Sequence, residues 1–98
     1  MYVYIWIYEV RPNTDEAFRG LYGRDGAWVA LFRRAAGYIG TELLHDRNDP
    51  KRYITIDRWE SPGAHRAFRE RFAAEFAELD RQGGALTTRE TQLGEYDV

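Results

Sequence analysis

The sequence predicts an α+β domain with the element order β-α-β-β-α-β. Residues 52–59 alternate as a strand does, residues 60–63 form a turn, and residues 64–79 repeat apolar residues at helical spacing. The same order occurs near the N-terminus, where a strand at 2–10 is followed by a break at 11–13 and helical signals. Each strand–helix unit precedes a further strand. Two such units predict one four-stranded antiparallel sheet with helices on one face.

The length and charge of the chain limit the protein classes to which it can belong. Its 98 residues suffice for a single domain, 1–98, with no room for a separate cofactor domain. The net charge of −2 argues against a nucleic-acid partner, and the absence of cysteine excludes thiolate chemistry. No apolar run approaches the ~20 residues of a membrane span, and the N-terminus lacks signal-peptide features. We therefore expect a cytoplasmic protein without a membrane partner.

The first strand is apolar on both faces. Val3, Ile5 and Ile7 share one face, whereas aromatic side chains (Tyr4, Trp6, Tyr8) share the other. A strand of this kind is covered on both sides. Helices can cover one face only, and the other is too aromatic to meet water. We expect the aromatic face to pack against a second copy of the chain, forming an obligate homodimer through the sheet.

The helices have recognisable ends. The first begins after Asn13 or Thr14, breaks at 23–26, restarts with Asp25 as its cap and runs over 27–36 to Gly37. The last begins at Ser61, an N-cap followed by proline, and ends at 82–84. Its buried stripe comprises Ala64, Phe68, Phe72, Phe76 and Leu79.

The middle strands, at 38–46 and 52–59, are joined by a turn, and a polar edge strand follows at 86–96. If His45 lies opposite Arg52, one shared face is aliphatic (Ile39, Thr41, Leu43, Ile54, Ile56). The other is aromatic and polar and contains Glu42, Asp57 and Trp59.

Three short segments resemble the antibiotic biosynthesis monooxygenase-like family of the dimeric α+β barrel superfamily. They are Gly37-Tyr38-Ile39-Gly40-Thr41-Glu42-Leu43-Leu44, the acidic turn 46–50, and Arg58-Trp59-Glu60-Ser61 before the last helix. The resemblance implies a ferredoxin-like fold, a dimeric barrel and cofactor-free oxygenation of phenols. Relatives that degrade haem carry a histidine further along the last helix and an asparagine on the first strand. Residues 67–69 and the first strand lack both, which argues against haem degradation.

Candidate site residues cluster near the turn before the last helix. His65 is the candidate general base for a phenol. The candidate substrate-binding residues are aromatic: Trp59, Trp6, Tyr4, Tyr53 and Phe72. We place the ligand in a cleft between the sheet and the last helix, bounded by Trp59 and reached by His65. No residue spacing indicates a metal or nucleotide site, so we expect neither a metal nor a cofactor.

Each candidate also has a purely structural interpretation. Trp59 is equally suited to pinning the last helix to the sheet. For the aromatic set, filling a dimer interior is the simpler expectation, and for His65 an exposed helical position is. Buried carboxylates at Glu42 or Asp57 are possible bases, although ion pairs with Arg52, Arg58 or Arg89 are the simpler expectation.

Two functions fit these observations. One is a cofactor-independent monooxygenase acting on a small phenolic or quinoid compound. The alternative is a non-catalytic dimeric barrel that binds a small molecule or only assembles. An enclosed cavity with a base favours the enzyme, and a filled interior favours the alternative.

Overall fold

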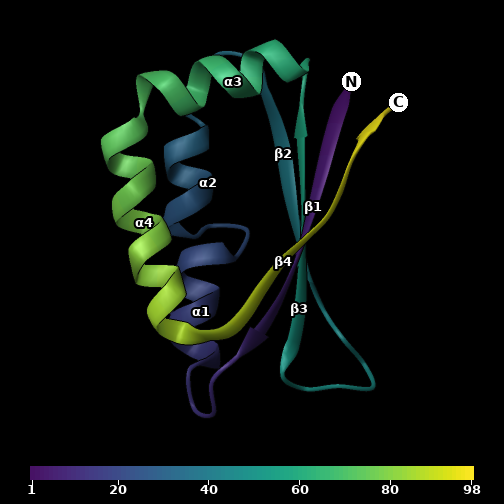
Figure 1. Cartoon of the computed structure of the whole chain (residues 1–98), viewed down its shortest axis with the longest axis vertical. Coiled ribbons are helices and arrows are strands. Elements are labelled where there is room, and N and C mark those ends of the chain that lie inside the picture. Colours follow the sequence, from purple (N-terminus) through teal and green to yellow (C-terminus); the bar gives the residue numbers. More distant parts are fainter.

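The computed structural model describes residues 1–98 and shows a ferredoxin-like α+β fold, as the sequence predicts. The four strands form one antiparallel sheet in the order β2-β3-β1-β4 (Figure 1). Their bounds are β1 Tyr2–Val10, β2 Tyr38–His45, β3 Arg52–Trp59 and β4 Thr87–Asp97. The predicted strands therefore match the observed ones to within about a residue at each end.

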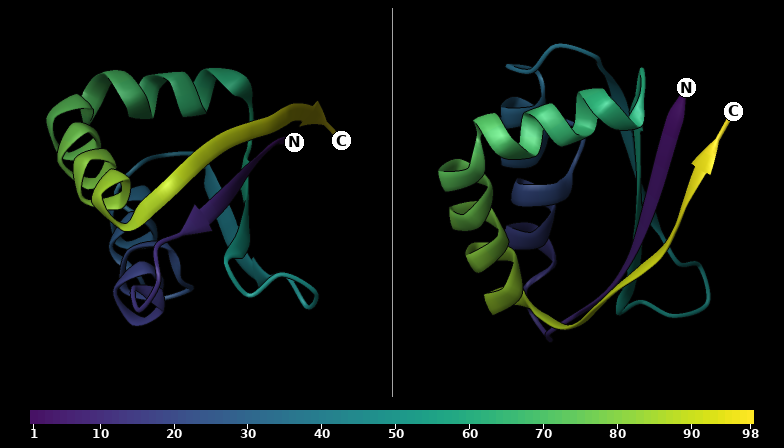
Figure 2. Two further views of the ribbon diagram at one scale, coloured as in Figure 1. Left: turned by 60° about the horizontal axis from the view of Figure 1, so that its bottom comes forward. Right: turned by 45° about the horizontal axis from the view of Figure 1, so that its top comes forward.

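The helices lie together on one side of the sheet, and the views in Figures 1 and 2 show no element on the other side. Each of the two crossovers contains two short helices. Their bounds are α1 Asp15–Tyr22, α2 Ala27–Phe32, α3 Pro62–Arg71 and α4 Ala73–Leu86. None of them is long and apolar enough to cross a membrane.

The predicted break within the first crossover is confirmed, but its capping residue differs. Gly26, rather than Asp25, is the N-cap of α2, which ends at Phe32 and not near residue 36. A Cβ at Gly26 would lie 2.7 Å from the carbonyl oxygen of Leu21. The close turn between α1 and α2 therefore requires glycine there, and this steric demand takes precedence over capping preference.

The predicted single helix 64–79 is two helices. Ser61 caps α3 as predicted, its Oγ accepting a hydrogen bond from the amide of Ala64 at 3.0 Å. Phe72 then leaves helical geometry, with φ −110° and ψ 31°, and α4 follows at an angle (Figure 2). Moreover, α4 continues through Gly83 and Gly84 instead of ending there. A Cβ at Gly83 would lie 2.1 Å from the Tyr22 hydroxyl, so glycine lets α1 and α4 approach closely.

The prediction of which sheet face the helices cover is wrong. The helices cover the aromatic face, where Tyr2, Tyr8, Tyr53 and Trp59 are buried with the helical aromatic residues. The aliphatic face is the outer one. It carries half-buried isoleucines together with Leu44, which is 44% exposed. A homodimer through the aromatic face is therefore excluded, because the chain's own helices occupy it.

The predicted register between β2 and β3 is also wrong, by one residue. His45 lies opposite Tyr53 and not Arg52. Thr41 and Leu43 consequently join Asp57 and Thr55 on the inner face. A one-residue slip moves every side chain to the opposite face. Glu42 therefore lies on the outer face, paired with Arg58 as one of the predicted alternatives has it.

Candidate functional site

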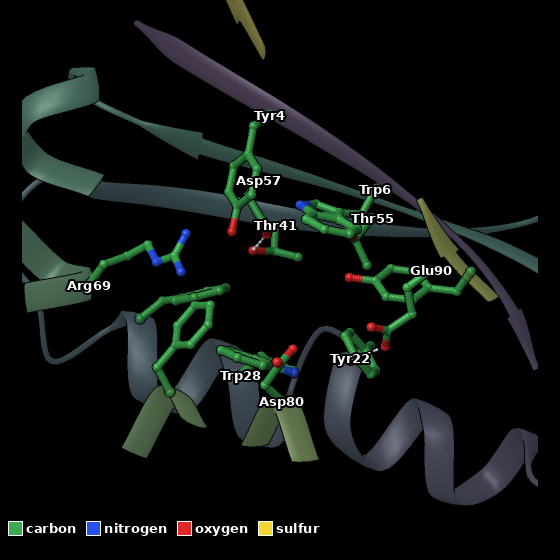
Figure 3. A pocket seen from close by; sticks show the side chains of 13 residues that line it. Tyr4, Trp6, Tyr22, Trp28, Thr41, Thr55, Asp57, Arg69, Asp80 and Glu90 are labelled. Carbon is green, nitrogen blue, oxygen red and sulfur yellow. Dashed lines mark hydrogen bonds between the residues drawn. The ribbon is translucent and has the colours of Figure 1, made fainter. Parts of the chain in front are cut away.

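A cavity of about 70 Å³ lies between the inner sheet face and the helices. Figure 3 shows Thr41 and Asp57 on its sheet side and Trp28 and Asp80 on its helix side. Aromatic rings form most of the wall: Tyr4, Trp6, Tyr8, Tyr22, Trp28, Phe32 and Phe76. The volume is several times the ~10–15 Å³ that one water requires, so the interior is incompletely filled. Hereafter this space is called the cavity.

Asp57 is the buried carboxylate on the sheet side of the cavity. Its side chain is on β3, and the residue is only 5% exposed. Thr41 Oγ1 donates a hydrogen bond of 2.6 Å to Asp57 Oδ1, and the Tyr38 hydroxyl donates one of 2.7 Å to Thr41 Oγ1. No basic side chain forms an ion pair with Asp57. Burial therefore raises the pKa of Asp57 from 3.8 to about 6, with the Thr41 hydrogen bond opposing part of the shift.

Two further polar groups at the cavity lack partners. Thr55 Oγ1 is buried next to Asp57 on the inner face and has no hydrogen-bond partner. Arg69 extends from α3 into the cavity (Figure 3) and takes part in none of the five ion pairs. Its guanidinium carbon lies 4.4 Å from the centre of the Phe76 ring. Thr55 Oγ1 can therefore form a hydrogen bond with a ligand. Arg69 is an exposed residue, and a ligand's negative charge can pair with it in place of water.

The other end of the cavity is acidic. Glu90 accepts hydrogen bonds from Thr87 Oγ1 at 3.3 Å and, at 3.5 Å, from the Tyr22 hydroxyl. Burial and the neighbouring charge of Asp80 raise the pKa of Glu90. The cavity thus has a doubly acidic end at β4 and α4, and an end where one carboxylate faces a free arginine.

The tyrosines of the cavity are neutral. Burial, together with the charge of Asp57, raises the pKa of Tyr4 well above its usual range. Burial likewise raises the pKa of Tyr8. These phenols can donate hydrogen bonds at neutral pH, but they cannot act as bases.

His65 lies in a packed group, here called the hinge cluster, that comprises Tyr2, Trp59, His65 and Phe68. Its ring centre is 5.4 Å from that of Trp59 and 5.7 Å from that of Tyr2. Burial, aided by the nearby charge of Arg69, lowers the pKa of His65 from 6.5 to about 4. His65 borders a separate open hollow with Glu95 and Arg66, and its Nε2 has no hydrogen-bond partner. The ring of Tyr4, centred 4.6 Å from that of His65, belongs to the cavity wall.

The structure separates the sequence-predicted site residues into two groups. Tyr4 and Trp6 line the cavity. Trp59, Tyr53 and Phe72 are core residues that do not line it, and Trp59 is completely buried. Trp59 bounds neither the cavity nor the hollow beside His65, so neither of these spaces is the predicted cleft. Trp59 instead packs against Phe32, Tyr38 and Phe68.

Tyr53 has a structural role in the first crossover. Its hydroxyl donates a 2.7 Å hydrogen bond to Asp15 Oδ2 and accepts a bond from Arg19 Nε at 3.2 Å. The ring of His45 stacks on it with centres 4.3 Å apart. Tyr53 thus joins β3 to α1, and it borders an open hollow beside Arg19 and His45 instead of the cavity.

The sequence prediction did not identify the polar part of the cavity. For Asp57 the sequence favours an ion pair with arginine over a role as a base, and the one-residue register error separates it from Thr41. Arg69 is exposed, as the predicted solvated face of the helix has it, but its side chain also lines the cavity, which the helical pattern does not indicate. A usable signal for Asp57 is its position between Thr55 and Trp59 in an inward-facing alternation, where a lone carboxylate breaks an otherwise uncharged face.

Comparison with known proteins gives a consistent result. The model of the family described as antibiotic biosynthesis monooxygenase matches residues 1–76. No curated protein matches the chain in sequence. Several solved structures share the fold at low identity. SnoaB, a cofactor-independent oxygenase from Streptomyces nogalater, aligns with a TM-score of 0.80 and 22% identity over 99% of this chain and 91% of that one.

Two other solved structures agree. PA3566 from Pseudomonas aeruginosa aligns with a TM-score of 0.74 and 23% identity over 99% of this chain and 92% of its own. Rv0793 from Mycobacterium tuberculosis gives a TM-score of 0.74 and 22% identity over 99% and 96% of the two chains. Identities at this level support a shared fold.

Proposed function

Since the chain belongs to the antibiotic biosynthesis monooxygenase family, we propose that it is a cofactor-independent monooxygenase of a small phenolic or quinoid compound. The observation that carries this proposal is the cavity, whose aromatic wall encloses a small polar centre. Flat aromatic molecules stack well in such surroundings, and a few polar groups suffice to orient them. Tyr4 and Trp6 are the proposed contacts to the ring. We assign no substrate contact to the other aromatic residues predicted from the sequence.

The proposed reaction is balanced without an external reductant. A phenol and one O₂ give a quinone and one water, so the substrate supplies all four electrons that reduce O₂. The ring carbon para or ortho to the hydroxyl loses hydrogen and gains oxygen. The protein would hold the ring, exclude water and accept the phenolic proton, which makes the ring electron-rich enough to react with oxygen.

The size of the cavity limits the substrate. An engineered cavity of about 150 Å³ accommodates benzene, whereas this one measures about 70 Å³. A ring therefore requires part of the wall to move. Arg69 is a wall residue that no ion pair holds in place, and it is exposed on its outer side.

The test uses two substitutions of Thr55, which is 3% exposed in the cavity wall. Thr55→Leu fills the cavity, while Thr55→Val keeps its volume and removes only the hydroxyl. With a panel of substituted phenols and naphthols, we expect the wild type to consume oxygen and form quinone. Thr55→Val should keep part of this activity, because it loses one polar contact but no space, and Thr55→Leu should lose it. Equal turnover by Thr55→Leu would refute the proposed site. Binding without oxygen uptake would favour the non-catalytic alternative.

We further propose that the chain forms a homodimer through the outer sheet face. That face carries Ile5, Ile7, Ile54 and Ile56, flanked by Leu44 and by Leu93, which is 54% exposed. An apolar patch of this kind on a small domain, with charged residues such as Arg58 and Glu42 beside it, is typical of an interface. Light scattering should therefore give a dimer for the wild type and for Ala77→Lys, on an exposed position of α4, but a monomer for Ile56→Lys. A wild-type monomer at micromolar concentration would contradict this.

A further inference from the structure

The environment of Asp57 differs from that of every other carboxylate in the protein. It is buried beside a cavity, and Thr41 is the only protein group that donates a side-chain hydrogen bond to it. Since that bond goes to Oδ1, the second oxygen, Oδ2, is left for a ligand. The Tyr38 hydroxyl orients the Thr41 hydroxyl at 2.7 Å, so that Thr41 donates toward Asp57. A carboxylate positioned this way is prepared to accept a proton from a bound molecule.

The other titratable groups around the cavity are less suited to accepting a proton. They are Tyr4, Tyr8, Tyr22, Tyr38, Arg69, Asp80 and Glu90, and of the carboxylates among them Asp80 is exposed to solvent. The tyrosines are protonated at neutral pH, and Arg69 is a cation. Glu90 is already hydrogen-bonded to two hydroxyls. His65 borders the open hollow instead of the cavity.

Arg69 supplies the complementary charge. Its guanidinium points into the cavity toward the side on which Asp57 and Thr41 lie (Figure 3). Asp57 does not neutralise it, because the two side chains form no ion pair. An anionic ligand in the cavity would therefore be attracted by Arg69, and an anionic oxygen in contact with Asp57 would be stable only if Asp57 carried the proton.

We propose that Asp57 is the proton acceptor for the hydroxyl of a bound phenol, that Thr41 and Tyr38 position it, and that Arg69 binds the phenolate. This inference rests on the proposed function, because it concerns the same cavity. The phenolic O–H bond breaks, a bond between that hydrogen and Asp57 Oδ2 forms, and the electron pair stays on the phenolate oxygen. No electrons leave the substrate in this step.

The experiment measures proton uptake when 4-nitrophenol binds, at a pH above the pKa of the free probe. Its absorption reports whether the bound molecule is ionised, and titration calorimetry in buffers of different ionisation enthalpy counts protons. We expect the wild type to bind the phenolate and to take up about one proton per probe, held by Asp57. Asp57→Asn should bind the phenolate without proton uptake.

Matched variants test the other two roles. Thr41→Val should raise the pH at which proton uptake is half complete, by about one unit, whereas Thr41→Ser should leave it unchanged. Arg69→Gln should weaken binding of the phenolate about tenfold, and Arg69→Lys should recover part of the loss. An unchanged proton-uptake profile in Thr41→Val would overturn the positioning role.

The outcomes separate this inference from the function on which it rests. If the wild type binds the probe, and Thr55→Leu abolishes that binding, but no proton is taken up, the assignment of Asp57 is wrong and the cavity still binds phenols. If the wild type does not bind the probe at millimolar concentration, both the inference and the proposed function fail. Proton uptake that persists in Asp57→Asn would also overturn the assignment.

Discussion

The hinge cluster and the cavity are neighbouring regions of one aromatic layer. Each contains a buried titratable group, but the two groups differ in their hydrogen-bond partners and in the free space beside them. In the hinge cluster, His65 is enclosed by Tyr2, Trp59 and Phe68 and has no partner for Nε2. In the cavity, Asp57 has one oriented donor and open space beside it. Burial keeps each group neutral over a wider pH range than in water. Only Asp57 combines this property with a position at the cavity, because His65 borders the separate open hollow.

The comparison shows that aromatic content alone does not identify a site. Trp59 and Trp6 both lie on the inner sheet face, but Trp59 contacts neighbouring rings on all sides, whereas Trp6 borders unfilled space. The first is a packing residue, and the second is a candidate ligand contact. Unfilled volume next to unpartnered polar atoms distinguishes them.

The largest expected effect is on stability, from replacing the two tryptophans. Trp59→Ala should lower the free energy of unfolding by about 3–5 kcal/mol, because it removes a completely buried ring. Trp6→Ala should cost less than about 2 kcal/mol but should abolish probe binding, because its ring is half-buried beside the cavity. Urea unfolding and fluorescence titration measure the two quantities. Equal losses of stability in Trp59→Ala and Trp6→Ala would contradict the proposed difference in packing between the hinge cluster and the cavity.

The next effect concerns Asp57. Its pKa is raised to about 6 in the folded protein, so the native state binds the extra proton more tightly than the unfolded chain does. The contribution of protonated Asp57 to the free energy of unfolding is fully present below about pH 4 and is lost as the pH rises through 6. Asp57→Asn carries no such charge and should be more stable than the wild type at pH 7, by about 1–3 kcal/mol. Below pH 4 the two should unfold alike, and a destabilised variant at pH 7 would contradict the analysis.

His65 should show the opposite pH dependence. Since its pKa is lowered to about 4, its contribution is present above pH 6.5 and is lost as the pH falls toward 4. His65→Phe should therefore gain about 1–2 kcal/mol relative to the wild type between pH 6.5 and 4, allowing for partial solvent screening. Between pH 4 and 6.5, the contribution of His65 to the free energy of unfolding rises with pH while that of Asp57 falls. Denaturation across the range should accordingly find the wild type less pH-dependent than either variant.

The smallest effect concerns the start of α3, the helix that carries both His65 and Arg69. Ser61→Ala removes the capping bond to the Ala64 amide and should cost about 1 kcal/mol. His65 follows within the first helical turn, while Arg69 lies a full turn later. Hydrogen exchange should therefore accelerate at the hinge cluster more than at Arg69. Uniform acceleration along α3 would show that the helix opens as one unit.

The error in face assignment has a physical origin in the first strand. Because both faces of residues 2–10 are apolar, period-two alternation cannot decide which face the helices cover. The neighbouring strand contains the deciding signal. Arg52 and Arg58 share a face with Ile54 and Ile56, and such a face meets solvent more readily than one whose only charge is Asp57. The inward face is aromatic because α1 and α2 contribute Phe18, Tyr22, Trp28 and Phe32 to the same layer.

The sequence by itself determined the strands, the order of the elements, the Ser61 cap and the family, because alternation, turn residues and capping are local properties of the chain. Only the tertiary structure decided the covered face, the register of β2 against β3, the break at Phe72 and the cavity. These features depend on how bulky rings from distant segments fill a shared space. Asp57 belongs to the second group, because its lack of an ion pair with any arginine follows from which side chains pack beside it.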